Sequence, residues 1–330
     1  MQIHYLEYLT TLARERHFGR AAKACNVSQP ALSQAIRQIE ASFGVPVIDR
    51  RSQGFHGFTQ EGQRILDWAR RMLADYQQLG QELSTLGEQG LSGHIRIGLI
   101  PVTTPMVSLL TTRFHRAQPG VTISILSQNF NDIHRRLERF ELDVGISYLD
   151  ADMPGNLRPY VLYRESYYLL APASHPLAAR KSIGWREAAT LPLCLLTPDM
   201  LNRMIVNRIF EQVGTVARTV IETNCAVTLC SHVRSGQWFT IVPDSFFYLI
   251  GDWNRTVPIP LVEPTESNEI GLLVQERDPM PPITRAFVDV AQGISIGNEL
   301  RKTAPVRDFH AAGVMNTTDE MSKQPADVRS

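Results

Sequence analysis

The sequence predicts a chain of three parts: an α+β winged helix-turn-helix domain, one long linker helix, and a larger α/β domain with two lobes. Three observations support this prediction. Two short helical patterns flank a tight turn near the amino terminus, an apolar heptad follows them, and strand and helix patterns then alternate over residues 94–300. With 330 residues, 43% hydrophobic and 20% charged, the chain has the size and composition of a globular protein with more than one domain.

The first domain is predicted over residues 1–58. Apolar residues at helical spacing indicate one helix over residues 4–16 and another over residues 18–26. Ser28 then fits the N-cap of a third helix, and Pro30 fits its first turn, where proline is tolerated. The pattern is that of two short helices joined by a tight turn.

The third helix has one apolar face and one polar face. Its apolar residues recur at spacings of four and three, which places them on one buried stripe of Leu32, Ile36 and Ile39. The opposite face can bond to base edges and phosphates and carries no acid; it consists of Gln29, Pro30, Ser33, Gln34 and Arg37. We therefore predict that this helix enters a DNA groove. The alternative is a plain helical hairpin within some other core.

The segment after this helix predicts a β-hairpin wing. Two short apolar pieces flank Gly54 and Gly57, and the wing would present Arg50 and Arg51 to phosphates. For Arg50 the alternative is a structural ion pair within the domain. Residues 1–58 hold seven Lys or Arg against four Asp or Glu, a local excess of positive charge that suits a phosphate-facing domain.

A long helix is predicted over residues 59–89. Its apolar residues alternate spacings of four and three through Ile65, Ala69, Met72, Tyr76, Leu79, Leu83 and Leu86. This heptad predicts a coiled-coil dimer with a second copy of the chain, although Gly80 and Gly87 weaken its later half. The alternative is a single amphipathic helix packed on its own domain.

The larger domain is predicted over residues 90–300. Its strand and helix patterns alternate in β-α-β order, which implies parallel strands joined by right-handed crossovers. Strands are expected at residues 94–100, 121–127, 142–149, 164–172, 191–197, 216–223, 238–243 and 269–275, and helices at 105–118, 131–140, 200–213, 226–235 and 283–300. We assign residues 91–162 and 268–300 to lobe I and residues 163–267 to lobe II, with a cleft between them. Residues 301–330 predict a disordered tail.

Other classes of protein are disfavoured by what the sequence lacks. The four cysteines form no CxxC pair and no zinc-type cluster, so we expect neither a bound metal nor another cofactor. GxSxG, P-loop and GxGxxG motifs are missing, which argues against an enzyme. No signal peptide and no apolar run long enough to span a membrane is seen, so the expected location is cytoplasmic.

The residues around the turn resemble the amino-terminal domain of LysR-type transcriptional regulators. The shared features are an Ala-Ala pair before the turn, a Ser-Gln-Pro-Ala start to the third helix, a Glu that closes it, a Gly followed by an apolar-x-Arg run, and Thr-x-x-Gly at the long helix. In this chain they are Ala21-Ala22, Ser28-Gln29-Pro30-Ala31 with Ser33, Glu40, Gly44, Val47-Ile48-Asp49-Arg50 and Thr59-Gln60-Glu61-Gly62. Further matches at residues 141–147, 173–178 and 239–243 extend the resemblance over about 300 residues. Ile48 and Phe58 depart from the usual residues, and the tail is not a family feature.

The resemblance implies a DNA-binding regulator whose effector domain is shaped like a periplasmic binding protein. Its partners would be double-stranded promoter DNA, a small-molecule inducer in the interlobe cleft, and further copies of the chain, as a dimer through residues 59–89 and then a homotetramer. RNA polymerase is a further candidate partner. The sign of regulation, activation or repression, stays open. The alternatives are a ligand-independent repressor with a degenerate cleft and an α/β enzyme fused to a DNA-binding domain.

Effector contacts are expected where strands end and helices begin, because free backbone N–H groups and hydroxyls gather there. The candidates from this rule and from matching family positions are Thr103, Thr104, Asn129, Ser147, Thr197 and Asn224. For each one alone, the alternative is simple N-capping or turn chemistry. These segments contain no Lys or Arg, so we expect a small neutral or singly charged ligand rather than a polyphosphate.

Overall fold

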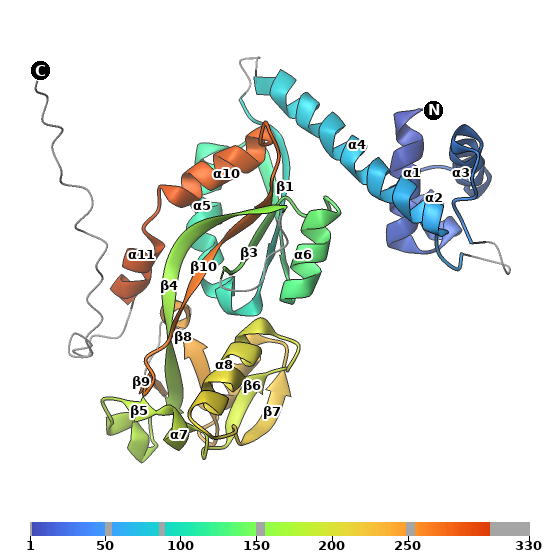
Figure 1. The fold of residues 1–330 in the computed structure, drawn as a ribbon. Coiled ribbons are helices and arrows are strands. Elements are labelled where there is room, and N and C mark those ends of the chain that lie inside the picture. The colour runs from blue at the N-terminus through green and yellow to red at the C-terminus, as the bar shows by residue number, and fades with distance from the viewer. Residues whose placement is uncertain (1, 50–54, 86–89, 150–155, 249–254, 304–330) are drawn as a thin grey trace, which may run out of the picture.

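The computed structural model describes residues 2–49, 55–85, 90–149, 156–248 and 255–303. Figure 1 shows a small helical head, one long helix, and a larger domain in which two lobes are stacked. The head stands apart from lobe II, and the long helix α4 reaches from the head to lobe I (Figure 1). The predicted fold class is confirmed.

Three helices form the head: α1 (Ile3–Glu15), α2 (Phe18–Ala24) and α3 (Gln29–Phe43). Their apolar stripes meet in one core, to which α3 contributes the predicted residues Leu32, Ile36 and Ile39. The Ser28 hydroxyl accepts a hydrogen bond from the Ala31 N–H at 3.3 Å, so Ser28 caps α3 as predicted.

Residues with left-handed backbone conformations form the turn before helix α3 and end that helix. Asn26 has φ 55° between α2 and α3, and Gly44 has φ 70° at the end of α3, where glycine is the least strained choice. The described part of the predicted wing contains one isolated antiparallel bridge, between Ile48 and Phe58, rather than a hairpin ladder. Arg50 and Arg51 lie outside the described residues.

Helix α4 (Gln60–Thr85) divides the predicted heptad between two environments. Ile65 and Ala69 are buried in the core of the head, at 8% and 0% exposure. Farther along, four large apolar residues are 40–59% exposed: Met72, Tyr76, Leu79 and Leu83. The first part of the heptad therefore packs inside the head, and only the second part forms an open apolar face. Leu86 and Gly87 lie outside the described residues.

Lobe I is built on three parallel strands. Strands β2 and β3 both pair with β1 in parallel register, as the alternating pattern predicted. In order the elements are β1 (Gly93–Leu99), η1 (Pro101–Met106), α5 (Val107–Ala117), β2 (Val121–Ser127), α6 (Phe130–Glu138) and β3 (Val144–Tyr148). The helix expected over residues 105–118 is thus preceded by a 3₁₀ turn that starts directly after the strand.

Lobe II repeats this arrangement on a second set of strands. Strand β6 pairs in parallel with both β7 and β8, and a strand not foreseen from the sequence, β9, pairs with β5 and β4. The elements of lobe II are η2 (Pro176–Ala179), β5 (Ile183–Gly184), α7 (Trp185–Ala188), β6 (Leu193–Leu196), α8 (Leu201–Gln212), β7 (Thr219–Thr223), α9 (Ala226–Arg234), β8 (Phe239–Pro243), η3 (Asp244–Tyr248) and β9 (Thr256–Val262).

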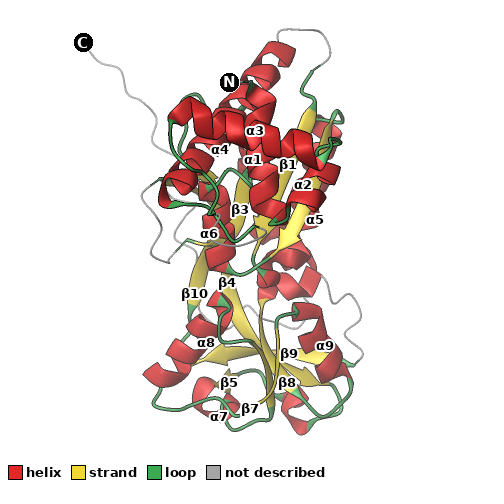
Figure 2. Cartoon of the chain, turned by 90° about the vertical axis from the view of Figure 1, so that its right-hand side faces the viewer, coloured by secondary structure: helices red, strands yellow, loops and turns green. Residues whose placement is uncertain are grey.

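Two antiparallel strands connect the lobes. Strand β4 (Leu157–Pro172) pairs with β10 (Ser267–Gln275) through Ser166 and then with β8 and β9. Figure 2 shows both strands passing between the lobes. The predicted change of lobe after residue 162 therefore falls inside one continuous strand. The two lobes share a backbone layer where the sequence pattern suggested separate units.

The chain returns to lobe I through α10 (Pro282–Gln292) and α11 (Ile296–Thr303), where one helix over residues 283–300 was expected. That expectation was wrong because Gly293 ends α10 before the chain resumes as α11. Helix α11 also continues past residue 300, and residues 304–330 of the predicted tail lie outside the described residues. Among the described helices, none combines the length and apolarity needed to cross a membrane.

Candidate functional site: the recognition helix, the linker helix and the interlobe cluster

The outer face of α3 holds the residues predicted to contact DNA. Gln29, Pro30, Gln34 and Arg37 are exposed, and Ser33 is half-buried. Because these amides and the guanidinium are exposed, they can reach base edges and phosphates without first leaving partners inside the protein. The face is therefore suited to a DNA groove.

The single acid of α3, Glu40, bonds to the backbone of the segment after the helix. One carboxylate oxygen of Glu40 accepts hydrogen bonds from the N–H groups of Val47 at 3.0 Å and Ile48 at 3.4 Å. Glu40 therefore ties the end of α3 to the segment that follows.

The junction between the head and α4 is fixed by Thr59 and Gly62. The Thr59 hydroxyl donates to Pro46 O at 2.6 Å and accepts from the Gly62 N–H at 2.8 Å, which caps the first turn of α4. A Cβ on Gly62 would lie 2.1 Å from Val47 O, closer than a side chain can approach. These contacts explain the Thr-x-x-Gly pattern, because they fix the direction in which α4 leaves the head.

Beyond the head, α4 has a docked polar face and an open apolar face. Three contacts join the polar face to lobe I: Arg70 with Glu141 at 3.0 Å, Asp75 with Arg277, and Gln78 with the carbonyl of Pro279 at 3.0 Å. A helix turns about 100° per residue, so the exposed apolar residues from Met72 to Leu83 lie on roughly the opposite side. The docked face holds the head against lobe I while the apolar face stays free.

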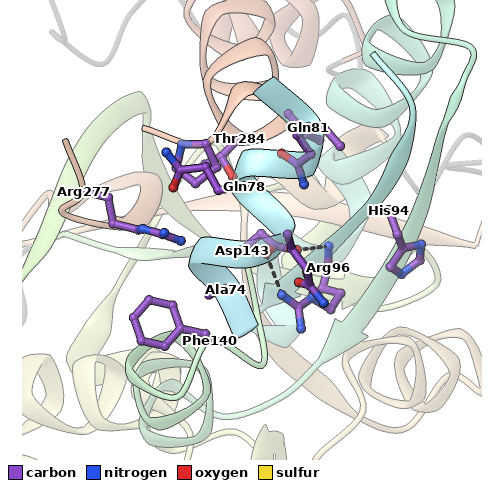
Figure 3. Close-up of a pocket in the computed structure, with 12 residues that line it drawn as sticks. Ala74, Gln78, Gln81, His94, Arg96, Phe140, Asp143, Arg277 and Thr284 are labelled. Atoms are coloured by element: carbon purple, nitrogen blue, oxygen red, sulfur yellow. Dashed lines mark hydrogen bonds and ion pairs between the residues drawn. The ribbon is translucent and has the colours of Figure 1, made fainter. Parts of the chain in front are cut away.

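A small cavity lies where α4 meets lobe I. In Figure 3, Ala74, Gln78 and Gln81 of α4 face the pair formed by Arg96 and Asp143, whose Nη2 and Oδ1 atoms are 2.7 Å apart. The cavity volume is about 40 Å³, which is room for a few water molecules and too little for a metabolite. We interpret it as part of the α4 docking interface.

Five buried polar residues form a second contact between the lobes. We call this set the interlobe cluster; it consists of Tyr148, Glu165, Tyr167, Asn202 and Asn268. The Tyr148 hydroxyl donates to Glu165 Oε1 and accepts from Asn202 Nδ2 at 2.9 Å. The Tyr167 hydroxyl accepts from Asn268 Nδ2 at 3.0 Å and lies 3.3 Å from the Tyr148 hydroxyl. All five residues are buried. Tyr148 ends β3 of lobe I and Asn202 begins α8 of lobe II, so the Asn202–Tyr148 bond crosses between the lobes.

The buried carboxyl of this cluster is held in its neutral form. Burial raises the pKa of Glu165 to about 8, the hydrogen bond from Tyr148 opposes the shift, and the charge of Asp244 adds to it. Burial also raises the pKa values of Tyr148 and Tyr167 well above the ordinary value. At neutral pH the cluster is therefore mainly an uncharged acid among uncharged hydroxyls and amides.

The structure places three of the predicted effector residues in structural roles or in the interior. The Thr103 side chain is fully buried, and its hydroxyl donates to Ile100 O at 2.9 Å. Asn129 performs the N-capping alternative, because it accepts from the Asp132 N–H at 2.8 Å. Ser147 is fully buried, and its hydroxyl has no hydrogen-bond partner among the described residues.

The other three predicted effector residues are accessible. Thr104 and Asn224 are exposed and Thr197 is half-buried. The N–H of Thr197 donates to Thr223 O at 3.0 Å, which keeps Thr197 at the end of its strand. Direct contact between any of the six residues and an effector stays a prediction.

The interlobe cluster was missed by the sequence reasoning, apart from the position of Tyr148 next to Ser147. The sequence did contain a signal for this cluster. Tyr163, Glu165 and Tyr167 are spaced two residues apart on β4, and side chains at this spacing share one face of a strand. An acid among apolar and aromatic positions of a buried strand face indicates a functional group. Asn268 lies directly opposite Glu165 on β10, and only the strand register reveals this.

Comparison with known proteins follows the same two-part division. The family model of the bacterial regulatory helix-turn-helix protein, lysR family, matches residues 3–63, and that of the LysR substrate binding domain matches residues 88–293. The chain is 30% identical over 244 residues to a hydrogen peroxide-inducible genes activator of Dickeya chrysanthemi, covering 74% of this chain and 79% of the relative. It is 28% identical over 295 residues to the DNA-binding transcriptional dual regulator OxyR of Escherichia coli, covering 89% and 95%.

Solved structures show the same arrangement of parts. A full-length OxyR variant from Pseudomonas aeruginosa aligns with a TM-score of 0.73 and 26% identity, covering 90% of this chain and 96% of the other. Full-length CbnR in complex with its target DNA aligns with a TM-score of 0.62 and 21% identity, covering 89% and 99%, which shows a shared fold. The helix-turn-helix head, the substrate-binding domain and these matches place the chain in the LysR family of transcriptional regulators.

Proposed function

We propose that the chain reads promoter DNA as a dimer and that an effector held between its lobes changes the geometry of the two reading helices. One observation carries the proposal: the acid-free outer face of α3 and the exposed apolar face of α4 belong to one connected unit, joined rigidly at Thr59 and Gly62. A second copy that covers the apolar face would bring a second recognition helix to the same DNA.

The apolar face of α4 supports a second copy of this chain as its partner. Four large apolar side chains at heptad spacing are exposed there, and their burial in a coiled coil is favourable at about 25 cal/mol per Å² of apolar area. Paired recognition helices can then meet half-sites in successive major grooves. Assembly of dimers into a homotetramer and contact with RNA polymerase are further parts of the proposal.

Within the recognition helix, each residue is proposed for the contact that its chemistry allows. Gln29 and Gln34 can read adenine, Arg37 can read guanine or hold a phosphate, and Pro30 and Ser33 shape the approach of the helix to the groove. Arg50 and Arg51 are proposed to hold phosphates beside the groove.

Effector control is proposed to act through the two interfaces described above. The interlobe cluster joins the lobes, and the polar face of α4 joins lobe I to the head. An effector that changes the angle between the lobes alters lobe I, and the docked α4 carries that change to the head. Thr103, Thr104, Asn129, Ser147, Thr197 and Asn224 remain the proposed effector contacts.

Some relatives are named as hydrogen peroxide-inducible activators, but we do not propose a peroxide response for this chain. A thiol reacts as its thiolate, and burial raises the pKa of Cys194 to about 11 and that of Cys230 to about 12. Both thiols are therefore protonated at neutral pH. Only Cys225 is exposed, and all four cysteines of the chain are free.

The proposal is tested by separating dimerisation from DNA reading. Leu79→Glu places a charge on the apolar face, so we expect a monomer by analytical ultracentrifugation and loss of operator binding in a gel shift on the promoter beside the chain's own gene. Arg71→Glu, on the same helix but away from the apolar face, is the matched control. A monomeric Leu79→Glu protein that binds the operator as tightly as the wild type would disprove the dimeric reader.

The effector part is tested separately by a thermal-shift screen of small metabolites followed by gel shifts with each compound that binds. Thr103→Val is expected to lose the inducer response while keeping operator binding. A chain that binds no metabolite and regulates its promoter constitutively would favour the alternative of a ligand-independent repressor.

A further inference from the structure

The interlobe cluster contains a buried acid whose second oxygen has no partner. Glu165 Oε1 accepts from the Tyr148 hydroxyl, whereas Glu165 Oε2 has no hydrogen-bond partner among the described residues. The side chain is 0% exposed, so this oxygen has no contact with bulk solvent. A buried polar atom without a partner is costly, and native proteins retain such atoms chiefly where they have a use.

The donors near Glu165 are already used elsewhere. Asn202 donates to the Tyr148 hydroxyl and Asn268 donates to the Tyr167 hydroxyl. These two amides therefore serve the hydroxyls, and the donors that reach Glu165 are the hydroxyls of Tyr148 and Tyr167. The cluster is therefore short of N–H donors at Glu165.

The described cations near the cluster bond to other groups. Arg164, the next residue on β4, points to the other side of the strand and pairs with Glu269 at 2.8 Å. Arg203 on α8 bonds to Leu196 O at 2.7 Å and to Glu222 at 2.9 Å. Neither guanidinium is available to Glu165.

The titratable groups that face Glu165 are acids and phenols. Tyr148 comes from β3, Tyr163 and Tyr167 from β4, and Asp244 from η3. The charge of Asp244 makes the surroundings of Glu165 more negative. This environment disfavours an anionic ligand and favours either a proton or an organic cation on Glu165.

From this geometry we propose that the interlobe cluster receives the ammonium group of a small amine, which replaces the proton of Glu165. An ammonium group supplies three N–H donors, one positive charge and no acceptor, which is what the ionised form of Glu165 needs. The inference rests on the proposed effector function, since it names the chemical class of ligand for that site.

Replacement of the Glu165 proton by the ammonium ion conserves charge and requires no covalent step. The neutral Glu165 acid and the ammonium ion form a carboxylate–ammonium pair, and one proton leaves to solvent. To admit the ammonium group, the Asn202–Tyr148 bond between the lobes must open, so binding at Glu165 is coupled to the angle between lobes I and II. Below the pKa of about 8 the amine competes with the proton, so its affinity rises with pH up to that value.

The test uses three probes of equal chain length and different charge: n-butylamine, n-butanol and butyrate. Each is titrated into the full-length chain by calorimetry into the millimolar range, in two buffers of different ionisation enthalpy. Butylamine alone is expected to bind, with close to one proton released at neutral pH and none above the pKa of Glu165. In Glu165→Gln, which keeps the size of the side chain and loses its charge, the affinity is expected to fall at least tenfold.

Two controls keep the result decisive. Glu269→Gln removes a half-buried acid from the neighbouring strand and is expected to leave butylamine binding unchanged. Thermal melting of Glu165→Gln shows whether this variant is folded. If Glu165→Gln does not fold, Glu165→Asp replaces it, with weaker binding and the same proton release expected. Equal binding of butylamine to wild type and variant, a preference for butanol or butyrate, or no binding of any probe would each overturn the amine assignment. An effector of another class found in the metabolite screen would still leave the proposed function standing.

Discussion

Helix α3 and the interlobe cluster are both polar, and they differ in where their polarity lies. The amides and guanidinium of α3 point into solvent, whereas the acid, phenols and amides of the cluster are buried between two lobes. Exposed polar groups keep their water until DNA replaces it, so α3 needs no internal partners. The cluster has lost its water already, so each of its groups depends on another residue of the chain.

This difference assigns different consequences to mutations in the two regions. On the proposed function, a substitution on the outer face of α3 is expected to remove a contact to DNA and to leave the folded chain intact. A substitution in the cluster leaves a buried group without its partner and changes stability and the linkage between the lobes. Measurements of stability and operator binding on the same variants therefore test the comparison directly.

The largest expected effect is on the pH dependence of stability in Glu165→Gln. The Glu165 carboxyl keeps its proton up to about pH 8 in the folded chain but loses it near 4.5 when unfolded. This group therefore stabilises the fold most below its unfolded pKa, and the contribution is lost as the pH rises to about 8. At about 1.36 kcal/mol per pH unit, the total is on the order of 4 to 5 kcal/mol. Glutamine does not titrate and should remove this slope.

Urea unfolding at several pH values between about 5 and 8 measures this slope. Glu269→Gln is the control, because that acid is paired with Arg164 at the surface and its loss should leave the slope near the wild-type value. Parallel slopes for wild type and Glu165→Gln would show that Glu165 is already ionised in the folded chain.

Arg37→Ala tests the exposed side of the comparison. Because Arg37 is exposed on the outer face of α3, operator binding should weaken by about 1–3 kcal/mol if the guanidinium reads a base, with little change in unfolding free energy. A gel shift at fixed salt measures the affinity, and Arg113→Ala on lobe I serves as the charge-matched control. Undiminished operator binding in Arg37→Ala would remove this residue from the DNA contact set.

Asn202→Ala tests the bond between the lobes. Loss of the Nδ2 donor leaves the buried Tyr148 hydroxyl with fewer partners, so stability should fall by about 1–2 kcal/mol. Operator affinity without effector should stay within a factor of about two, since the head is untouched. Thermal and urea unfolding measure the first effect, and Gln212→Ala, at an exposed position of the same helix, is the control. A loss of operator affinity as large as that in Arg37→Ala would contradict the separation of the two regions.

The smallest expected effect belongs to the cap of the recognition helix. Ser28→Ala removes the acceptor for the Ala31 N–H and should reduce the stability of the head by about 1 kcal/mol. Ser28→Asn preserves a capping side chain and should restore most of this loss. Amide hydrogen exchange in the first turn of α3 is the sensitive measurement, and unchanged protection in Ser28→Ala would show that the cap is not needed.

Most of the head could be predicted because its signals are local. The cap at Ser28, the glycine that ends α3 and the stripe from Leu32 to Ile39 each depend on residues within a few positions. The sequence did not reveal which heptad residues are buried in the head and which form the open apolar face. Ile65 and Ala69 follow the same spacing as Leu79, and only their packing into the core of the head removes them from the open face.

By itself the sequence determined the order of elements, the acid-free face of α3 and the heptad of α4, because side chains a few residues apart on one helix share a face whatever surrounds them. Tertiary structure alone decided that β4 serves both lobes, that α4 docks its polar face on lobe I, and that Asn202 and Asn268 meet the tyrosines beside Glu165. These contacts join residues far apart in the chain, and their free energy depends on burial and on strand register. Neither quantity exists until the chain has folded.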